Sequence, residues 1–134
     1  MQERYTFDSE AILSFYLDED GAEVVEDCLE QVQSDKAEGY ISIINLTEIF
    51  YILSRVSPEM AEETERKLRL LGIKVVSVDD NGLWREAAHV KAKHPLSLAD
   101  AFAVATAKTA ESKLVVGSDK EFKKLNIQLV RIRE

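Results

Sequence analysis

The segments LSLADAFAVATA (residues 96–107) and KLVVGSD (residues 113–119) decide the fold class of this chain. Residues 98–110 are apolar nearly all round, which predicts a helix that is buried rather than exposed along one side. The short apolar run at 114–116 predicts a buried strand soon after that helix. This pair indicates an interior built from both kinds of element.

The same alternation extends in both directions from these segments. Gly39 interrupts the helical pattern before the second strand, Pro58 opens a helix at its first turn, and Gly72 ends that helix. The predicted strands cover residues 4–7, 40–44, 74–78, 114–116 and 127–132. The predicted helices cover residues 9–17, 20–35, 46–56, 58–72, 81–93, 98–110 and a short segment near 120–125. This order predicts an α/β fold in three layers, with helices on both faces of a mainly parallel sheet.

Size and composition indicate one globular domain over residues 1–134. The chain has 46% hydrophobic and 31% charged residues, and no apolar run approaches the roughly 20 residues of a membrane span. The N-terminus lacks the basic start and apolar stretch of a signal peptide, so we expect a cytoplasmic protein with no membrane partner. The single cysteine, Cys28, excludes an internal disulfide and lies on the apolar face of its predicted helix, which places it in the expected core.

Charge is distributed unevenly along the chain. The formal net charge is −8, which on its own disfavours a nucleic-acid partner. Residues 1–84 carry 7 Lys or Arg and 19 Asp or Glu, whereas residues 85–134 carry 10 and 6. Solvated helix faces explain the C-terminal lysines, but they also offer a modest basic surface: Lys91, Lys93, Lys108, Lys113, Lys120, Lys123 and Lys124.

Four acidic residues occupy positions that can converge at one end of such a sheet. Asp8 stands where the first strand ends, and Asp119 follows the fourth strand. Glu48 lies within the first turn of the helix predicted after the second strand. Asp100 is the only charged residue within residues 98–107. Ligands of parallel sheets gather beyond the carboxyl ends of the strands, so this edge is the expected place for chemistry.

Each acid also has a structural explanation. Asn45 and Glu48 are spaced as a capping box, in which the acid bonds back to the backbone of the cap residue, and so are Ser97 and Asp100. The first and last acids can be helix caps or turn residues. As a set, however, carboxylates beside buried apolar segments lose hydration and repel one another. A divalent cation such as Mg²⁺ or Mn²⁺ removes both costs, so the set predicts a metal site.

In order and spacing, four segments resemble the PIN-domain family, and in particular its branch of VapC-like ribonuclease toxins. The segments extend over essentially the whole chain: YTFDSEAILSFY (5–16), ISIINLTEIFYIL (41–53), LSLADAFAVATA (96–107) and LVVGSDKEF (114–122). The resemblance implies a PIN-like fold and a metal-dependent endoribonuclease that hydrolyses RNA phosphodiester bonds. It also implies a homodimer and a small antitoxin protein as partner.

The resemblance further implies a role for each acid. Asp8, Glu48 and Asp100 match the metal ligands of the family, and Asp119 matches a fourth acid that helps through water or a second metal. We therefore expect these four residues to be catalytic and to bind Mg²⁺ or Mn²⁺. A cation held there would offset charge on the phosphate and generate hydroxide from a bound water near neutral pH.

Three polar residues are candidates for supporting these ligands. Ser9 and Asn45 can hold the ligands or contact a phosphate, although a helix cap explains each of them at least as well. Gly117 occupies a position where the family often has Thr or Ser, so we expect Ser118 to substitute for that hydroxyl. Single-stranded or looped RNA is the expected substrate because its bases are accessible.

Other residues carry weaker signals, and two other functions fit the same acids. His89 and His94 lack metal-ligand spacing, while Trp84 can stack on a base but is expected in the core from its helical spacing. One alternative is an acidic-pocket phosphatase or receiver domain with Asp8 as phosphoryl acceptor, for which Glu10 is the only second acid nearby. The other is a PIN-like module that binds protein or RNA without cleaving it.

Overall fold

The computed structural model describes residues 2–118, 122 and 124–133. Within them, one sheet of five strands is formed by β1 (Glu3–Phe7), β2 (Ala37–Ser42), β3 (Ile73–Val76), β4 (Lys113–Val116) and β5 (Leu129–Arg131). The strand order is β3-β2-β1-β4-β5, and each of these pairings is parallel. The prediction of a mainly parallel sheet is therefore confirmed.

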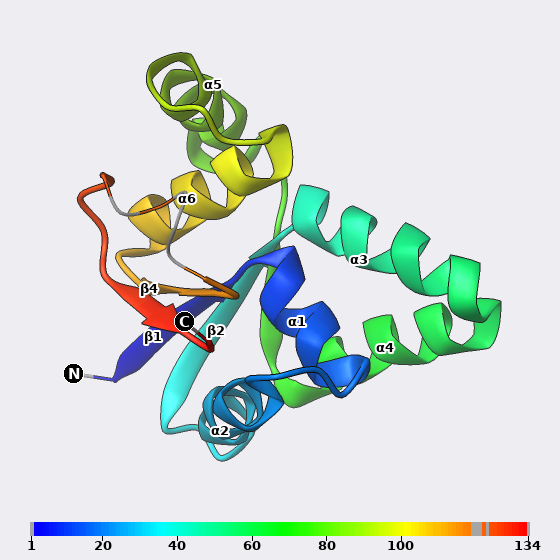
Figure 1. The fold of residues 1–134 in the computed structure, drawn as a ribbon. Coiled ribbons are helices and arrows are strands. Elements are labelled where there is room, and N and C mark those ends of the chain that lie inside the picture. Colours follow the sequence, from blue (N-terminus) through cyan, green and yellow to red (C-terminus); the bar gives the residue numbers. More distant parts are fainter. Residues whose placement is uncertain (1, 119–121, 123, 134) are drawn as a thin grey trace.

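Helices cover both faces of this sheet (Figure 1). One face carries α5 (Leu83–Lys93), which follows a short 3₁₀ turn η1 (Asp80–Gly82), and α6 (Leu98–Ala110). The other face carries α1 (Ser9–Tyr16), α2 (Ala22–Gln33) and the hairpin of α3 (Ile43–Val56) and α4 (Pro58–Leu71). The three layers are as predicted. Among the described residues, no helix combines the length and apolar character that crossing a membrane requires.

The direction of α6 brings an acid to the carboxyl edge of the sheet. Residues 101–107 of this helix are all buried, as its apolar sequence predicted. The helix packs across β1, β2 and β4. Because β4 is parallel to β1, the helix that precedes β4 must run back across the sheet and therefore begins at the carboxyl edge. Asp100, in its first turn, lies at that edge for this reason.

The boundary between β2 and α3 differs from the prediction. Gly39 lies inside β2 rather than before it, and residues 43–44 belong to α3 rather than to the strand. A Cβ on Gly39 would meet Ile73 Cδ1 at 2.6 Å and Val32 Cγ2 at 3.0 Å, so close packing selects glycine there. The β-branched residues 43–44 favour a strand by propensity, but the cap supplied by Ser42 starts a helix at this point.

The burial of two side chains and the boundaries of several elements can also be compared with the predictions. Trp84 is 49% exposed rather than in the core, because the buried line of α5 runs through Leu83, Ala87 and Val90. Cys28 is in the core, as predicted. The remaining strands and α2 lie within two residues of the predicted boundaries. Half of the helix predicted near 120–125, residues 120, 121 and 123, lies outside the described part of the chain. These residues include Lys120 and Lys123 of the basic set.

Candidate acidic site

Asp8 is the first residue after β1 and the cap of α1. Its Oδ1 accepts a hydrogen bond from the Ala11 N–H at 2.8 Å, and its own N–H donates to the Val115 carbonyl at 3.1 Å. The residue is only 2% exposed. The cap explanation therefore holds for Asp8, but it does not account for a carboxylate, because Asn caps a helix equally well without burying a charge.

Two further acids come from helices that begin at the same edge. The N-terminal cap of α3 is Ser42, whose Oγ accepts the Asn45 N–H at 3.0 Å, so the predicted capping box with Asn45 as the cap is wrong. Glu48 consequently lies in the second turn of α3. The cap predicted at Ser97 is present: its Oγ accepts the Asp100 N–H at 3.1 Å and starts α6.

The charges of the neighbouring acids affect the pKa of Asp8. Burial raises the pKa of Asp8 well above its ordinary value, and the hydrogen bond from Ala11 opposes that rise. The negative charges of Asp100, Glu10 and Glu48 raise the pKa of Asp8 further. Three carboxylates, each from a different helix, are thus close enough to Asp8 to disfavour its charged form.

A cavity of about 350 Å³ lies at this group of acids. We call it the acidic cavity, because four of its lining residues are acids and the rest are apolar or carry hydroxyls. The lining residues are Ser9, Glu10, Leu13, Leu17, Glu19, Glu48, Ile52, Ser97 and Asp100. An anionic phosphate would be repelled from such a surface unless a cation stood between them.

A buried hydrogen-bond network joins the three helices that carry the acids. Asn45 has no exposed surface, and its Nδ2 donates to Ser9 Oγ at 3.0 Å and to the Ala99 carbonyl at 3.1 Å. Ser42 Oγ donates to Asn45 Oδ1 at 2.5 Å. These bonds connect α1, α3 and α6 beneath the site. A fully buried Asn45 is placed to support the acids rather than to contact a phosphate.

The chemistry of the donors fits a hard divalent cation. Carboxylate oxygens are the ligands that Mg²⁺ and Mn²⁺ prefer, and a cation would offset the repulsion that raises the pKa of Asp8. Within the described part of the chain, no group of three or more His, Cys, Asp or Glu side chains is arranged to hold a metal ion by itself. Ser118 is half-buried after β4, and Asp119 lies outside the described residues. The agreement of this site with a divalent cation therefore rests on its carboxylate donors and on the burial of Asp8.

Two acids of the cavity were missed by sequence reasoning as site residues. Glu10 lies in the first turn of α1, two residues after Asp8. A helix that begins at the carboxyl edge presents its first turn there, and this signal pointed to Glu10. Glu19 comes from the turn that follows α1, where no motif marks it.

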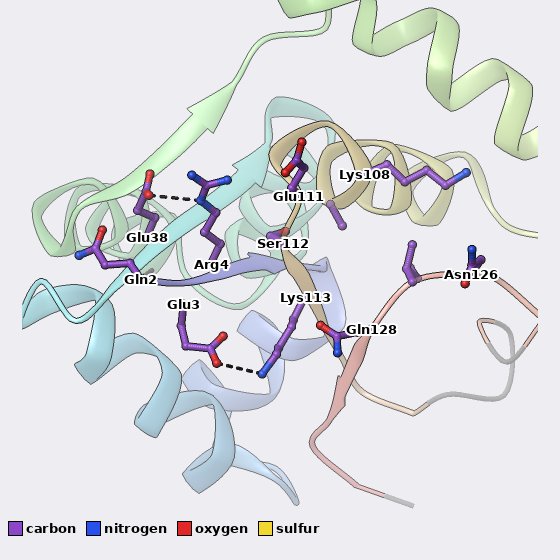
Figure 2. Close-up of a pocket in the computed structure, with 12 residues that line it drawn as sticks. Gln2, Glu3, Arg4, Glu38, Lys108, Glu111, Ser112, Lys113, Asn126 and Gln128 are labelled. Carbon is purple, nitrogen blue, oxygen red and sulfur yellow. Dashed lines mark hydrogen bonds and ion pairs between the residues drawn. The ribbon is translucent and has the colours of Figure 1, made fainter.

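A larger cavity, of about 640 Å³, lies at the opposite edge of the sheet, around the beginnings of β1 and β4 (Figure 2). Four of its charged residues form two ion pairs across the neighbouring strands. Arg4 Nε lies 3.3 Å from Glu38 Oε2, and Lys113 Nζ lies 3.1 Å from Glu3 Oε1, as the dashed lines in Figure 2 mark. Such pairing of exposed charges is typical of a structural surface.

Comparisons with known proteins place the fold. The chain matches a family model described as PIN domain over residues 5–128. No curated protein sequence matches it. DNA-bound VapBC from Salmonella typhimurium has a TM-score of 0.74 at 16% identity, covering 98% of this chain and 99% of that one. A toxin–antitoxin complex from Klebsiella pneumoniae gives 0.73 at 17%, covering 97% and 98%. Mycobacterium tuberculosis VapC20, described as a Sarcin-Ricin loop cleaving toxin, gives 0.72 at 16%, covering 95% and 98%.

At these identities the solved structures show a shared fold. The family match is of a different kind, because it rests on sequence and spans residues 5–128. That range contains all four acids singled out from the sequence, Asp8, Glu48, Asp100 and Asp119. The chain belongs to the PIN domain family.

Proposed function

We propose that this protein is a metal-dependent endoribonuclease that hydrolyses RNA phosphodiester bonds with Mg²⁺ or Mn²⁺. The observation that carries the proposal is the burial of Asp8 at the carboxyl edge within electrostatic reach of Glu10, Glu48 and Asp100. A residue needed only as a helix cap gains nothing from this arrangement, since an uncharged cap avoids its cost. A bound cation turns the same arrangement into a favourable one.

Each acid has a role in the proposed mechanism. Asp8, Glu48 and Asp100 hold the ion through carboxylate oxygens, and Asp119, supported by Ser118, completes the set or orients the attacking water. The ion, when bound, offsets charge on the phosphate and lowers the pKa of a bound water. The Asn45 network, which includes Ser9 Oγ, keeps the acid-bearing helices in a fixed relation.

The similar structures support a place for the protein in a toxin–antitoxin pair. Those from Klebsiella pneumoniae and Salmonella typhimurium are toxin–antitoxin or VapBC complexes. We propose by analogy that the chain is the toxin, that it forms a homodimer in the cytoplasm, and that an antitoxin protein binds it. The description of VapC20 as a Sarcin-Ricin loop cleaving toxin supports single-stranded or looped RNA as the substrate.

The family match disfavours the phosphatase or receiver alternative, because it assigns residues 5–128 to a PIN domain. A module that binds RNA or protein without cleaving it keeps the same fold, so activity has to separate it from the nuclease.

The direct test is cleavage of a long structured RNA by the purified protein with Mn²⁺ or Mg²⁺. We expect cutting that EDTA abolishes and that Asp100→Asn reduces by more than about 100-fold, the upper range for residues that merely support a metal ligand. Asp27→Asn is the matched control, because it makes the same change on an exposed position of α2. Its cleavage should equal that of the unaltered protein.

The outcomes divide the candidate functions. Equal cutting by Asp100→Asn and the unaltered protein would place the activity elsewhere or in a contaminant. Binding of Mn²⁺ without any cutting, over a range of structured and unstructured RNAs, would favour the non-catalytic module. Equal cutting of fully duplexed RNA would contradict the preference for single-stranded or looped RNA.

A further inference from the structure

Glu10 shares the acidic cavity with two of the proposed metal ligands. It lies in the first turn of α1 and lines the cavity together with Glu48 and Asp100. Position therefore associates Glu10 with the same group of acids, although its side chain is more exposed than that of Asp8.

A C-terminal arginine holds the Glu10 carboxylate. One guanidinium nitrogen of Arg133 donates to Glu10 Oε2 at 2.5 Å. The other donates to Ser14 Oγ and to the Asp20 carbonyl, each at 2.9 Å. The Arg133 backbone N–H donates to the Gly117 carbonyl at 3.1 Å, which fixes the backbone of Arg133 beside the end of β4. The arginine is thus anchored on its own account and can fix the direction of the Glu10 side chain.

The backbone at Gly117 leaves room for that carboxylate. A Cβ built on Gly117 would stand 2.3 Å from both Cδ and Oε1 of Glu10. No side chain at residue 117 is compatible with this position of Glu10, because real contacts of a Cβ are longer than 3 Å. The carboxylate consequently lies directly against the end of β4, at the edge where Asp8 leaves β1.

We propose that Glu10 is a fifth carboxylate of the metal site and that Arg133 and Gly117 are the residues that position it. Glu10 contributes an oxygen to the divalent ion or to water bound to that ion. Arg133 fixes the carboxylate and limits its repulsion with the other acids before an ion binds. The inference rests on the metal site of the proposed function, and it adds a ligand that comes from the first turn of α1.

Binding of Mn²⁺ to the full-length protein, followed by electron paramagnetic resonance, tests the proposal without an RNA substrate. We expect Glu10→Gln to weaken Mn²⁺ binding by about tenfold, within the range for groups that support a metal site. Gly117→Ala should weaken it in the same direction, since the added methyl displaces the Glu10 carboxylate while every acid is retained. Arg133→Gln should also weaken it, because the carboxylate loses its anchor.

Glu3→Gln is the matched control. Glu3 also pairs with a cation, Lys113, but at the opposite edge of the sheet, so this variant loses an ion pair without touching the acidic cavity. Its Mn²⁺ affinity should equal that of the unaltered protein. Thermal unfolding by circular dichroism, recorded for each variant, separates loss of folded protein from loss of ion binding.

Three results would overturn the proposal. Unchanged Mn²⁺ affinity in folded Glu10→Gln would remove Glu10 from the site, and an equal loss in Glu3→Gln would reduce the effect to general charge. Tighter binding by Arg133→Gln would show that the arginine competes with the ion rather than positioning a ligand. If Asp100→Asn loses Mn²⁺ binding while Glu10→Gln does not, only this inference fails. If the unaltered protein binds no Mn²⁺, the proposed metal site fails with it.

Discussion

The two edges of the parallel sheet shift the pKa of an acidic residue in opposite directions. At the amino edge, Glu38 accepts hydrogen bonds from Tyr40 Oη at 2.7 Å and from Lys74 Nζ at 3.1 Å, and these bonds lower its pKa to about 2. At the carboxyl edge, burial and neighbouring acids raise the pKa of Asp8. The charged form of Glu38 is favoured by the fold, whereas the charged form of Asp8 is opposed by it. A buried carboxylate such as Asp8, whose charged form the fold opposes, is best explained by a bound cation that stabilises the charged form.

The largest expected effect comes from Asp8→Asn, which should separate activity from stability. RNA cleavage should fall by more than about 100-fold, because a proposed metal ligand is lost. The melting temperature in EDTA should stay the same or rise, since Asn caps a helix as well as Asp and buries no charge. Gel assays of RNA cleavage and thermal circular dichroism measure the two effects.

Glu38→Gln makes the same acid-to-amide change at the amino edge and should have the reverse result. Cleavage should be unaffected, and the melting temperature should fall slightly, because hydrogen bonds to a charged acceptor are weakened. Retained cleavage in Asp8→Asn together with a lower melting temperature would mean that both edges serve structure alone.

An intermediate effect is expected from Asn45→Ala, which tests whether the support beneath the acids carries stability. The change leaves the buried hydroxyls of Ser9 and Ser42 and the Ala99 carbonyl short of partners, so the free energy of unfolding should fall by about 1–3 kcal/mol. Urea unfolding monitored by fluorescence measures it. Thr47→Ala is the control on the same helix, because it removes an exposed hydroxyl that donates to the Ile43 carbonyl. An equal fall in the free energy of unfolding of the two variants would show that the buried network stabilises the protein no more than an exposed hydrogen bond does.

The smallest effect concerns pH, and its sign differs between the two edges. The pKa of Asp8 is raised above 3.8, so its contribution to stability is present below that pH and is lost as pH rises through the raised pKa. The pKa of Glu38 is lowered from 4.5 to about 2, so its contribution is present above pH 4.5 and is lost as pH falls toward 2. Melting temperatures in EDTA at roughly pH 4 and pH 8 are the measurement.

Relative to Asp8→Asn, the unaltered protein should lose stability between the lower and the higher pH. Relative to Glu38→Gln, it should gain stability over the same interval. The same sign in both comparisons would contradict the contrast between the edges.

How much of the fold and site can be predicted from sequence depends on the range of the interactions that decide each feature. The position of Asp100 at the carboxyl edge was predictable, because a lone charge near the start of a buried helix is visible within a dozen residues. The start of α3 was not, because the cap by Ser42 overrides the strand propensity of residues 43–44. The contact that holds Glu10 could not be predicted for a different reason, because its partner, Arg133, is 123 residues away. Nothing in the local sequence around Glu10 indicates that contact.

The pairing of β1 with β4 also determines when the site can exist. Phe7 pairs with Val115, and the Asp8 N–H donates to the Val115 carbonyl, so the first acid acquires its surroundings from a strand near the other end of the sequence. During synthesis, residue 8 emerges from the ribosome long before residue 115 is added to the chain. An unfinished or truncated chain that lacks β4 therefore has no assembled site, and the proposed activity would arise only after residues 113–116 have been translated and have paired with β1.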